Sequence, residues 1–196
     1  MFKRSIYILL SLVLIVGLSS SCILDPKQKQ QDGGGGNKVE YKDLTAEDDV
    51  LFNLELCYNE RNFKEYDKLL DENFTYILSE ADYNSGVVDV PQWDRDVEIG
   101  KTAQIFNPNL PGDLRVIGID LNLTYSTGNW SEEPENEAHP DEKWYVKTVD
   151  YDLVVKTADD WEHRALDLKT QFTIRWAQTS EGGHWRIVLW RDDVAQ

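Results

Sequence analysis

The residue types that most often react or hold metals are scarce in this chain. It contains three histidines, His139, His163 and His184, and two cysteines, Cys22 and Cys57. The histidines show no HxH or HxxxH spacing, so no metal triad is visible, and we expect all three on the surface. Cys57 falls in the apolar stripe of a predicted helix, where a buried, inert thiol is expected, and no GxSxG segment marks a nucleophile elbow. The sequence therefore predicts no nucleophilic centre, no metal and no cofactor.

Carboxylates are abundant, and two groups of them could do chemistry. Asp150 and Asp152 alternate along a predicted strand, so both point to one face and could form an acid/base dyad. Thr148 shares that face while the apolar side chains lie on the other, which favours carboxylates that face solvent. Residues 131–142 are rich in Asp and Glu and could bind calcium weakly. They lack the EF-hand pattern, however, and are better interpreted as a solvated loop.

A third group of candidates is aromatic and would line a pocket. Its members carry rings with polar tips: Tyr58, Tyr66, Tyr76, Trp93 and Tyr151. Arg191 continues the alternation of Ile187 and Leu189, so we expect it to point inward and to meet a ligand carboxylate or a buried acid. The alternative is that the aromatic side chains simply fill the core, with Arg191 paired to a neighbouring aspartate at the rim.

The elements that position these residues belong to a strongly acidic chain. Its 196 residues carry a formal charge of -16 and have a pI near 4.5. No basic stripe is available for phosphates, so we expect neither nucleic-acid binding nor attraction to anionic lipids. Hydrophobic residues at 41% and aromatic residues at 11% suffice for a sizeable core, and the length predicts one folded domain.

The first 22 residues predict export and anchoring. A cationic start precedes an apolar run over residues 6–18, which is typical of a signal peptide and too short to span a bilayer comfortably. The segment that follows, Leu-Ser-Ser-Ser-Cys over residues 18–22, resembles the lipobox of bacterial lipoproteins, with Ser19 where that box usually has leucine. The resemblance implies that Cys22 carries the lipid, such as palmitate, and becomes the mature N-terminus.

This reading divides the chain into three parts. We expect a lipoprotein signal peptide over residues 1–21, a flexible tether over 22–43 that starts at the lipidated Cys22, and a folded domain over 44–196. The tether contains a run of four glycines, which behaves as flexible coil. The domain would therefore lie outside the cytoplasm, in the cell envelope or periplasm, anchored to either the inner or the outer membrane.

Helices dominate the first half of the folded domain. A helix over residues 45–61 is predicted, with Thr45 as N-cap and a buried stripe from Val50 to Tyr58. Asn62 can cap a second, short helix, and a strand is expected over 74–78. A third helix is predicted from about residue 93 or 94 to 107, with Val97, Ile99, Ala103 and Phe106 on its apolar face.

Strands dominate the second half. Apolar residues alternate over residues 117–125, 145–155, 166–176 and 185–189, and short polar links favour an antiparallel meander. The third of these segments predicts Leu166 and Trp176 on its inward face. Helices followed by a meander define an α+β fold with helices packed on one face of a curved sheet.

This order of elements resembles the nuclear transport factor 2-like superfamily, which includes SnoaL-like polyketide cyclases and ketosteroid isomerases. The resemblance covers residues 44–194 and rests on segments 53–63, 69–74 and 185–193 together with the element order. It implies a cone of three helices packed on a curved antiparallel sheet, with an apolar pocket between them. No catalytic residue set of the superfamily can be matched to this chain, so no catalysis is carried over.

Two functions follow as hypotheses. The first is a lipid-anchored extracytoplasmic binding or interaction module that takes a small apolar or anionic ligand. The alternative is a SnoaL-like enzyme of isomerase, cyclase or dehydratase type that acts on a small apolar molecule and uses Tyr76, Asp150 or Asp152 for acid/base work. Two copies of the domain could also pair through their sheets.

The lipid anchor can be tested in cells. When the full chain is expressed in a bacterium fed labelled palmitate, the wild type should incorporate label, and Cys22→Ser should not, because it lacks the thiol that forms the thioether. Equal labelling of the two proteins would contradict the lipobox interpretation.

Overall fold

The computed structural model describes residues 39–84, 89–112, 115–133, 142–179 and 182–192. The elements along the chain are α2 (Glu47–Glu60), α3 (Phe63–Leu69), β1 (Leu70–Ile77), α4 (Glu80–Asn84), β2 (Gln92–Asp94), α5 (Arg95–Phe106), β3 (Val116–Thr124), β4 (Ser131–Glu132), β5 (Trp144–Thr157), β6 (Glu162–Thr179) and β7 (Gly182–Arg191). Within these ranges no helix has the length and apolar character needed to cross a bilayer. The predicted signal peptide, Cys22 and most of the tether lie outside the described residues.

Helix α2 begins one residue later than predicted. Ala46, not Thr45, occupies the N-cap position, and the Asp49 carboxylate accepts a hydrogen bond from its backbone N–H at 3.0 Å. Acidic residues in the first turn suit the positive end of the helix dipole. The predicted stripe from Val50 to Tyr58 is buried, as the 3.6-residue spacing requires.

The cap predicted for α3 is confirmed, and α5 has a cap that was not predicted. The Asn62 side chain accepts the Glu65 N–H at the start of α3, and Asp94 accepts the Val97 N–H at the start of α5. Strand β1 begins at Leu70, earlier than the expected residue 74. Its pairing with β7 shifts register between Leu70 and Thr75, so the strand has an irregularity just before the segment where it was expected to begin.

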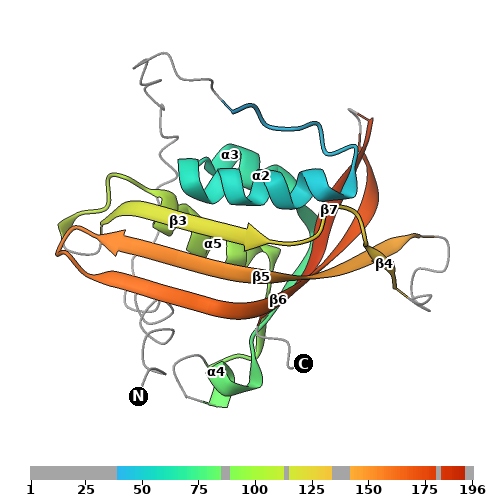
Figure 1. The fold of residues 1–196 in the computed structure, drawn as a ribbon. Coiled ribbons are helices and arrows are strands. Elements are labelled where there is room, and N and C mark those ends of the chain that lie inside the picture. The colour runs from blue at the N-terminus through green and yellow to red at the C-terminus, as the bar shows by residue number, and fades with distance from the viewer. Residues whose placement is uncertain (1–38, 85–88, 113–114, 134–141, 180–181, 193–196) are drawn as a thin grey trace.

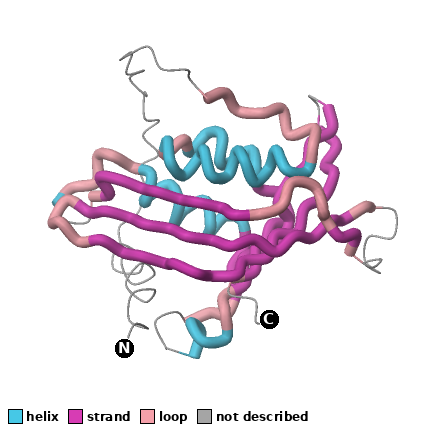
Figure 2. Tube along the Cα trace, viewed as in Figure 1, coloured by secondary structure: helices cyan, strands magenta, loops and turns pink. Residues whose placement is uncertain are grey.

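The seven strands form one sheet in the order β2-β1-β7-β6-β5-β3, with β4 paired to β5. The neighbours β3, β5, β6 and β7 pair antiparallel, which confirms the predicted meander. Strand β1 lies parallel to β7, so the sheet is mixed, not purely antiparallel as expected. Figure 1 shows the long strands bending so that α2, α3 and α5 lie on one side, while the short α4 stands apart. The same layering of helices on a curved sheet is visible in Figure 2.

A bulge in β6 changes which residues face the helices. Tyr151 pairs with Leu168, but Leu153 pairs with Ala165, so β6 has one residue more than β5 over this stretch. An extra residue moves the following side chains to the other face. As a result Ala165 is buried while Leu166 is 41% exposed, and the predicted inward position of Leu166 is wrong. Trp176 is equally exposed, which is also contrary to the pattern.

A second bulge, in β7, has larger consequences. Thr173 pairs with Leu189 and Ile174 with Ile187, so Val188 is the additional residue. Ile187 and Trp190 are both buried, at 0% and 2% exposure, although three positions separate them. The inward face predicted from Ile187 through Leu189 to Arg191 therefore ends at Ile187, and the inward placement of Arg191 is wrong.

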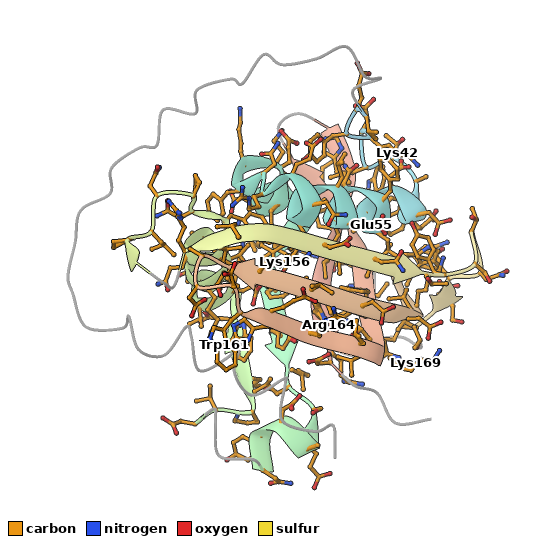
Figure 3. All side chains as sticks on the ribbon, turned by 60° about the vertical axis from the view of Figure 1, so that its left-hand side comes forward. Lys42, Glu55, Lys156, Trp161, Arg164 and Lys169 are labelled. Carbon is orange, nitrogen blue, oxygen red and sulfur yellow. The ribbon has the colours of Figure 1, made fainter. Side chains whose placement is uncertain are left out.

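The core fills the space between the helices and the concave side of the sheet. Large side chains without solvent contact come from helices and strands alike, among them Leu54, Tyr66, Phe74 and Phe172. Figure 3 shows Lys156, Arg164 and Lys169 on the opposite face of the strands. The α+β class and the packing of three helices on a curved sheet are thus as the sequence predicts.

Leu54 provides a test of this core. Because its side chain is fully buried, Leu54→Ala should lower the free energy of unfolding by about 2 to 5 kcal/mol through lost burial and a cavity. Leu166→Ala, which changes an exposed leucine, is the matched control and should cost little. Chemical denaturation of both variants measures the difference, and equal costs would contradict the packing.

Candidate functional site

A cavity of about 120 Å³ lies between α5, β1 and β2 on one side and β5, β6 and β7 on the other. Its aliphatic wall comes from Ile105, Leu153, Val155, Ala165 and Leu168. The remainder of the lining is aromatic or polar. This places the cavity where the resemblance implies a pocket, between the helices and the sheet.

Five aromatic residues line the cavity: Tyr58, Tyr76, Trp93, Tyr151 and Trp190. Tyr76 stacks on Trp93 with a centroid distance of 4.3 Å and an interplanar angle of 3°. Trp190 contacts Tyr76 at 5.4 Å and Tyr151 at 5.9 Å. The rings hold one another in fixed orientations, so the wall is a preformed aromatic surface.

The Glu98 carboxylate is the most highly bonded group of the site. One of its oxygens accepts the Tyr66 hydroxyl at 2.7 Å and the Thr102 hydroxyl at 3.0 Å. The other oxygen accepts the Trp93 indole N–H at 2.7 Å. The residue is buried at 5% exposure, and these neutral donors satisfy a charged group that would otherwise be costly to bury.

Helix α5 presents Glu98 because its inward face differs from the predicted one. Its buried residues are Glu98, Thr102 and Phe106, which are spaced four apart, whereas Val97 is 45% exposed. The predicted face shared only Phe106 with this stripe. Sequence reasoning missed Glu98 and Thr102 because polar residues on a helix are usually taken for its solvent side.

Lys101 brings a cation to the same end of the cavity. Its ammonium nitrogen lies 4.7 Å from the centre of the Trp93 ring, within the range of a cation–π interaction. Partial burial lowers the pKa of Lys101 below its usual value, and the charge of Glu98 acts in the opposite direction. Lys101 was also missed from the sequence.

Asp192 follows β7 and lines the cavity in place of Arg191. Its backbone N–H donates to the Ile77 carbonyl at 2.9 Å, and the Thr170 hydroxyl donates to its carboxylate at 3.3 Å. Burial raises the pKa of Tyr76 and Tyr151, and the charge of Asp192 adds to the effect. Both phenols therefore stay protonated at neutral pH and can donate hydrogen bonds.

The six pocket candidates from the sequence separate into three groups. Four of them, Tyr58, Tyr76, Trp93 and Tyr151, line the cavity. Tyr66 is fully buried behind it and serves as a hydrogen-bond donor to Glu98. Arg191 is exposed and donates to the Gln171 side chain at 3.3 Å, so it cannot set the charge preference of the cavity. Ligand binding by these residues stays a prediction.

The acid/base pair considered from the sequence lies elsewhere. Asp150 is exposed and forms an ion pair with Lys169 across the strands, and neither Asp150 nor Asp152 is among the residues that line the cavity. Of the candidates proposed for acid/base work, the structure brings only Tyr76 to the cavity. The inward carboxylates are Glu98 and Asp192.

The remaining candidates are mostly as expected, with one exception. Burial raises the pKa of Cys57 to about 12, as for an inert core thiol. His184 is partly exposed, with its Nδ1 2.9 Å from the Asp43 carbonyl. His163 contradicts the expected surface location, because it is buried beside Val155 on the inner side of β6, and burial lowers its pKa.

The acidic loop lies largely outside the described residues, as does His139. Among the residues that the structure describes, no group of three His, Cys, Asp or Glu side chains is arranged to hold a metal ion.

No family model matches the sequence, and no curated protein matches it either. Solved structures with a similar course of the chain include a ketosteroid isomerase-like protein from Erwinia carotovora atroseptica, which is 8% identical, with 78% of this chain and 97% of that chain covered and a TM-score of 0.46. A nuclear transport factor 2-like superfamily protein from Salmonella enterica is 10% identical, with 75% and 87% covered and a TM-score of 0.44. ActVI-ORFA from Streptomyces coelicolor is 11% identical, with 73% and 90% covered and a TM-score of 0.43.

These similarities concern the fold alone and assign neither ligand nor reaction to this chain. Helices α2, α3 and α5 pack against one side of a curved mixed sheet, which is the α+β architecture that the sequence predicts. What the cavity does must be argued from its own residues.

The role of Glu98 in holding the cavity wall can be measured. Glu98→Met should lower the free energy of unfolding by at least about 1 to 3 kcal/mol, because three buried donors lose their acceptor. Glu98→Gln should cost less, since its amide oxygen still accepts at least one of them. Glu65→Gln, which changes an exposed ion pair with Lys68, is the control and should be nearly neutral. If Glu98→Met and Glu65→Gln unfold alike in denaturant, the hydrogen bonds to Glu98 do not support the wall.

Proposed function

We propose that this protein is a lipid-anchored binding module that holds a small molecule in the cavity of its cone. The observation that carries the proposal is the preformed cavity with five aromatic rings and a few polar groups. Ligand sites in proteins typically combine an apolar wall with a small number of placed polar side chains. The cavity has this composition.

The size of the cavity limits the ligand. An apolar cavity of about 150 Å³ holds one benzene molecule. At about 120 Å³ the cavity here suits a compact group of similar or smaller size, and the rest of a longer ligand would extend through its opening. The phenols of Tyr76 and Tyr151 are available to donate hydrogen bonds to a polar atom of that group.

The lipid anchor is the second part of the proposal. It is supported by the apolar run, the segment that resembles a lipobox and the glycine-containing tether. In a bacterial envelope the anchor at Cys22 would keep the domain beside a membrane, and the tether would leave the cavity free to meet small molecules in the surrounding compartment.

An enzyme is the second candidate, and one observation favours it. Asp192 places a carboxylate at a cavity that also holds the protonated phenols of Tyr76 and Tyr151. A carboxylate can remove a proton from a carbon next to a carbonyl group while a phenol donates to the carbonyl oxygen. The residues proposed from the sequence for this work, Asp150 and Asp152, are replaced by Asp192.

Binding can be tested with toluene and phenol as small single-ring probes. Calorimetry with the full chain in detergent should detect binding of these probes to the wild type. Ala165→Leu should abolish it by filling the cavity, and Ala177→Leu, which changes another buried alanine of β6 outside the cavity, should leave it unchanged. Leu168→Ala should widen the cavity and admit naphthalene.

The outcomes separate the two candidates and the failure of both. Absence of binding to the wild type, or equal effects of the two alanine variants, would contradict a ligand site in the cone. A ketone that binds the cavity can also be incubated with the protein in D2O. Incorporation of deuterium at the carbon next to the carbonyl by the wild type, but not by Asp192→Asn, would favour the enzyme.

A further inference from the structure

One cation already occupies the aromatic wall. Tyr76 covers one face of the Trp93 ring, and the Lys101 ammonium approaches the ring at 4.7 Å, so it must lie over the other face. The indole N–H of Trp93 donates to Glu98 at 2.7 Å, which places a carboxylate at the edge of the same ring. The faces of aromatic rings attract cations through their quadrupole. Lys101 thus marks a position in the cavity, over the Trp93 ring, where a positive charge is favoured.

The charges around this position favour a cationic ligand. Two carboxylates, Glu98 and Asp192, line the cavity, and Lys101 is the one cation among its described lining residues. Arg191, which would have reversed this balance, is exposed on the other face of β7. The two carboxylates would repel an anionic group that enters the cavity, whereas they would attract a cation.

The hydrogen bonding of the wall narrows the class of cation. Both oxygens of Glu98 already accept bonds from protein donors, and Asp192 accepts one from Thr170. A bare ammonium group needs several acceptors to replace its hydration shell. An alkylated ammonium has few or no N–H groups and presents methyl surface to the rings, so it gains from the aromatic wall and needs little hydrogen bonding.

We propose that the cavity binds a small organic cation with an alkylated ammonium head, which sits against the aromatic rings and is attracted by Glu98 and Asp192. This inference rests on the proposed binding function and names its ligand class. Lys101 competes with the ligand, because its ammonium uses the same ring and repels the incoming charge. The ligand can therefore use this position only when the Lys101 side chain turns away.

The experiment compares three probes of nearly equal shape. Choline carries a trimethylammonium head, 3,3-dimethylbutan-1-ol has carbon in place of the nitrogen, and 3,3-dimethylbutanoate carries a negative charge instead. Calorimetric titration of the full chain in detergent should give choline at least tenfold tighter binding than the neutral alcohol. The carboxylate should bind more weakly than both.

Two pairs of variants identify the charges responsible. Asp192→Asn should weaken the binding of choline at least fivefold and leave the binding of the alcohol unchanged. Asp150→Asn, which removes the same charge from the outer face, should change the binding of neither probe. Lys101→Met should tighten the binding of choline several-fold, because it removes the competing cation. Lys156→Met, which changes an exposed lysine paired with Glu162, is its control and should have no comparable effect.

Each outcome decides a specific point. Equal or tighter binding of the alcohol would overturn the cationic ligand class and leave the cavity as a site for neutral molecules. Equal effects of Asp192→Asn and Asp150→Asn would show that the overall negative charge, not the cavity, attracts choline, and would also overturn the inference. If choline fails to bind the wild type and Lys101→Met, the inference is wrong. The proposed function fails with it only if toluene and phenol do not bind either.

Discussion

The burial of one carboxylate constrains the side of the cavity wall that α5 and β2 form. Glu98 lies in α5, and its donors come from α3, from β2 and from α5 itself. A buried carboxylate without hydrogen bonds is strongly unfavourable, so a displacement of any of these elements would leave a charged oxygen or a buried donor unpaired. The same bonds orient the Trp93 ring, on which Tyr76 stacks and over which Lys101 lies. The geometry of the site therefore depends on Glu98, although the carboxylate itself has no oxygen left without a donor.

The sequence predicted the main helices and the long strands, but not the short elements α4, β2 and β4 or the local irregularities that decide side-chain direction. The helix cap Asn62 could be recognised because its side chain satisfies a backbone N–H group near in sequence. The bulge at Val188 could not, because it falls in a run of apolar residues in which either phase gives a plausible inward face. Only the pairing with β6 shows that Ile187 and Trp190 share a side. Long-range register is absent from a single sequence.

The candidate site was predictable to the extent that apolar burial determines it. Tyr58, Tyr76, Trp93 and Tyr151 lie outside β6 and β7, the strands that carry the bulges, so their identification did not depend on those irregularities. The charged residues were missed, or were placed on the wrong face of their strand, for a physical reason. Charged side chains are normally found in solvent, so Glu98 and Lys101 had no pattern that marked them as inward, and the phase change in β7 exchanged Arg191 for Asp192.

That exchange gives Lys101 a role in the charge balance of the cavity. Glu98 and Asp192 repel each other across a cavity that is largely apolar, and a cation held between ring and carboxylate offsets part of this repulsion. A residue that offsets this repulsion necessarily opposes a ligand of the same charge. Its partial burial makes the arrangement reversible, because a long, flexible side chain can turn its ammonium into solvent when another cation takes its place. In the proposed binding function, this one lysine sets the balance between stability and binding, while the Trp93 ring and the two carboxylates stay where the hydrogen bonds of Glu98 and Thr170 hold them.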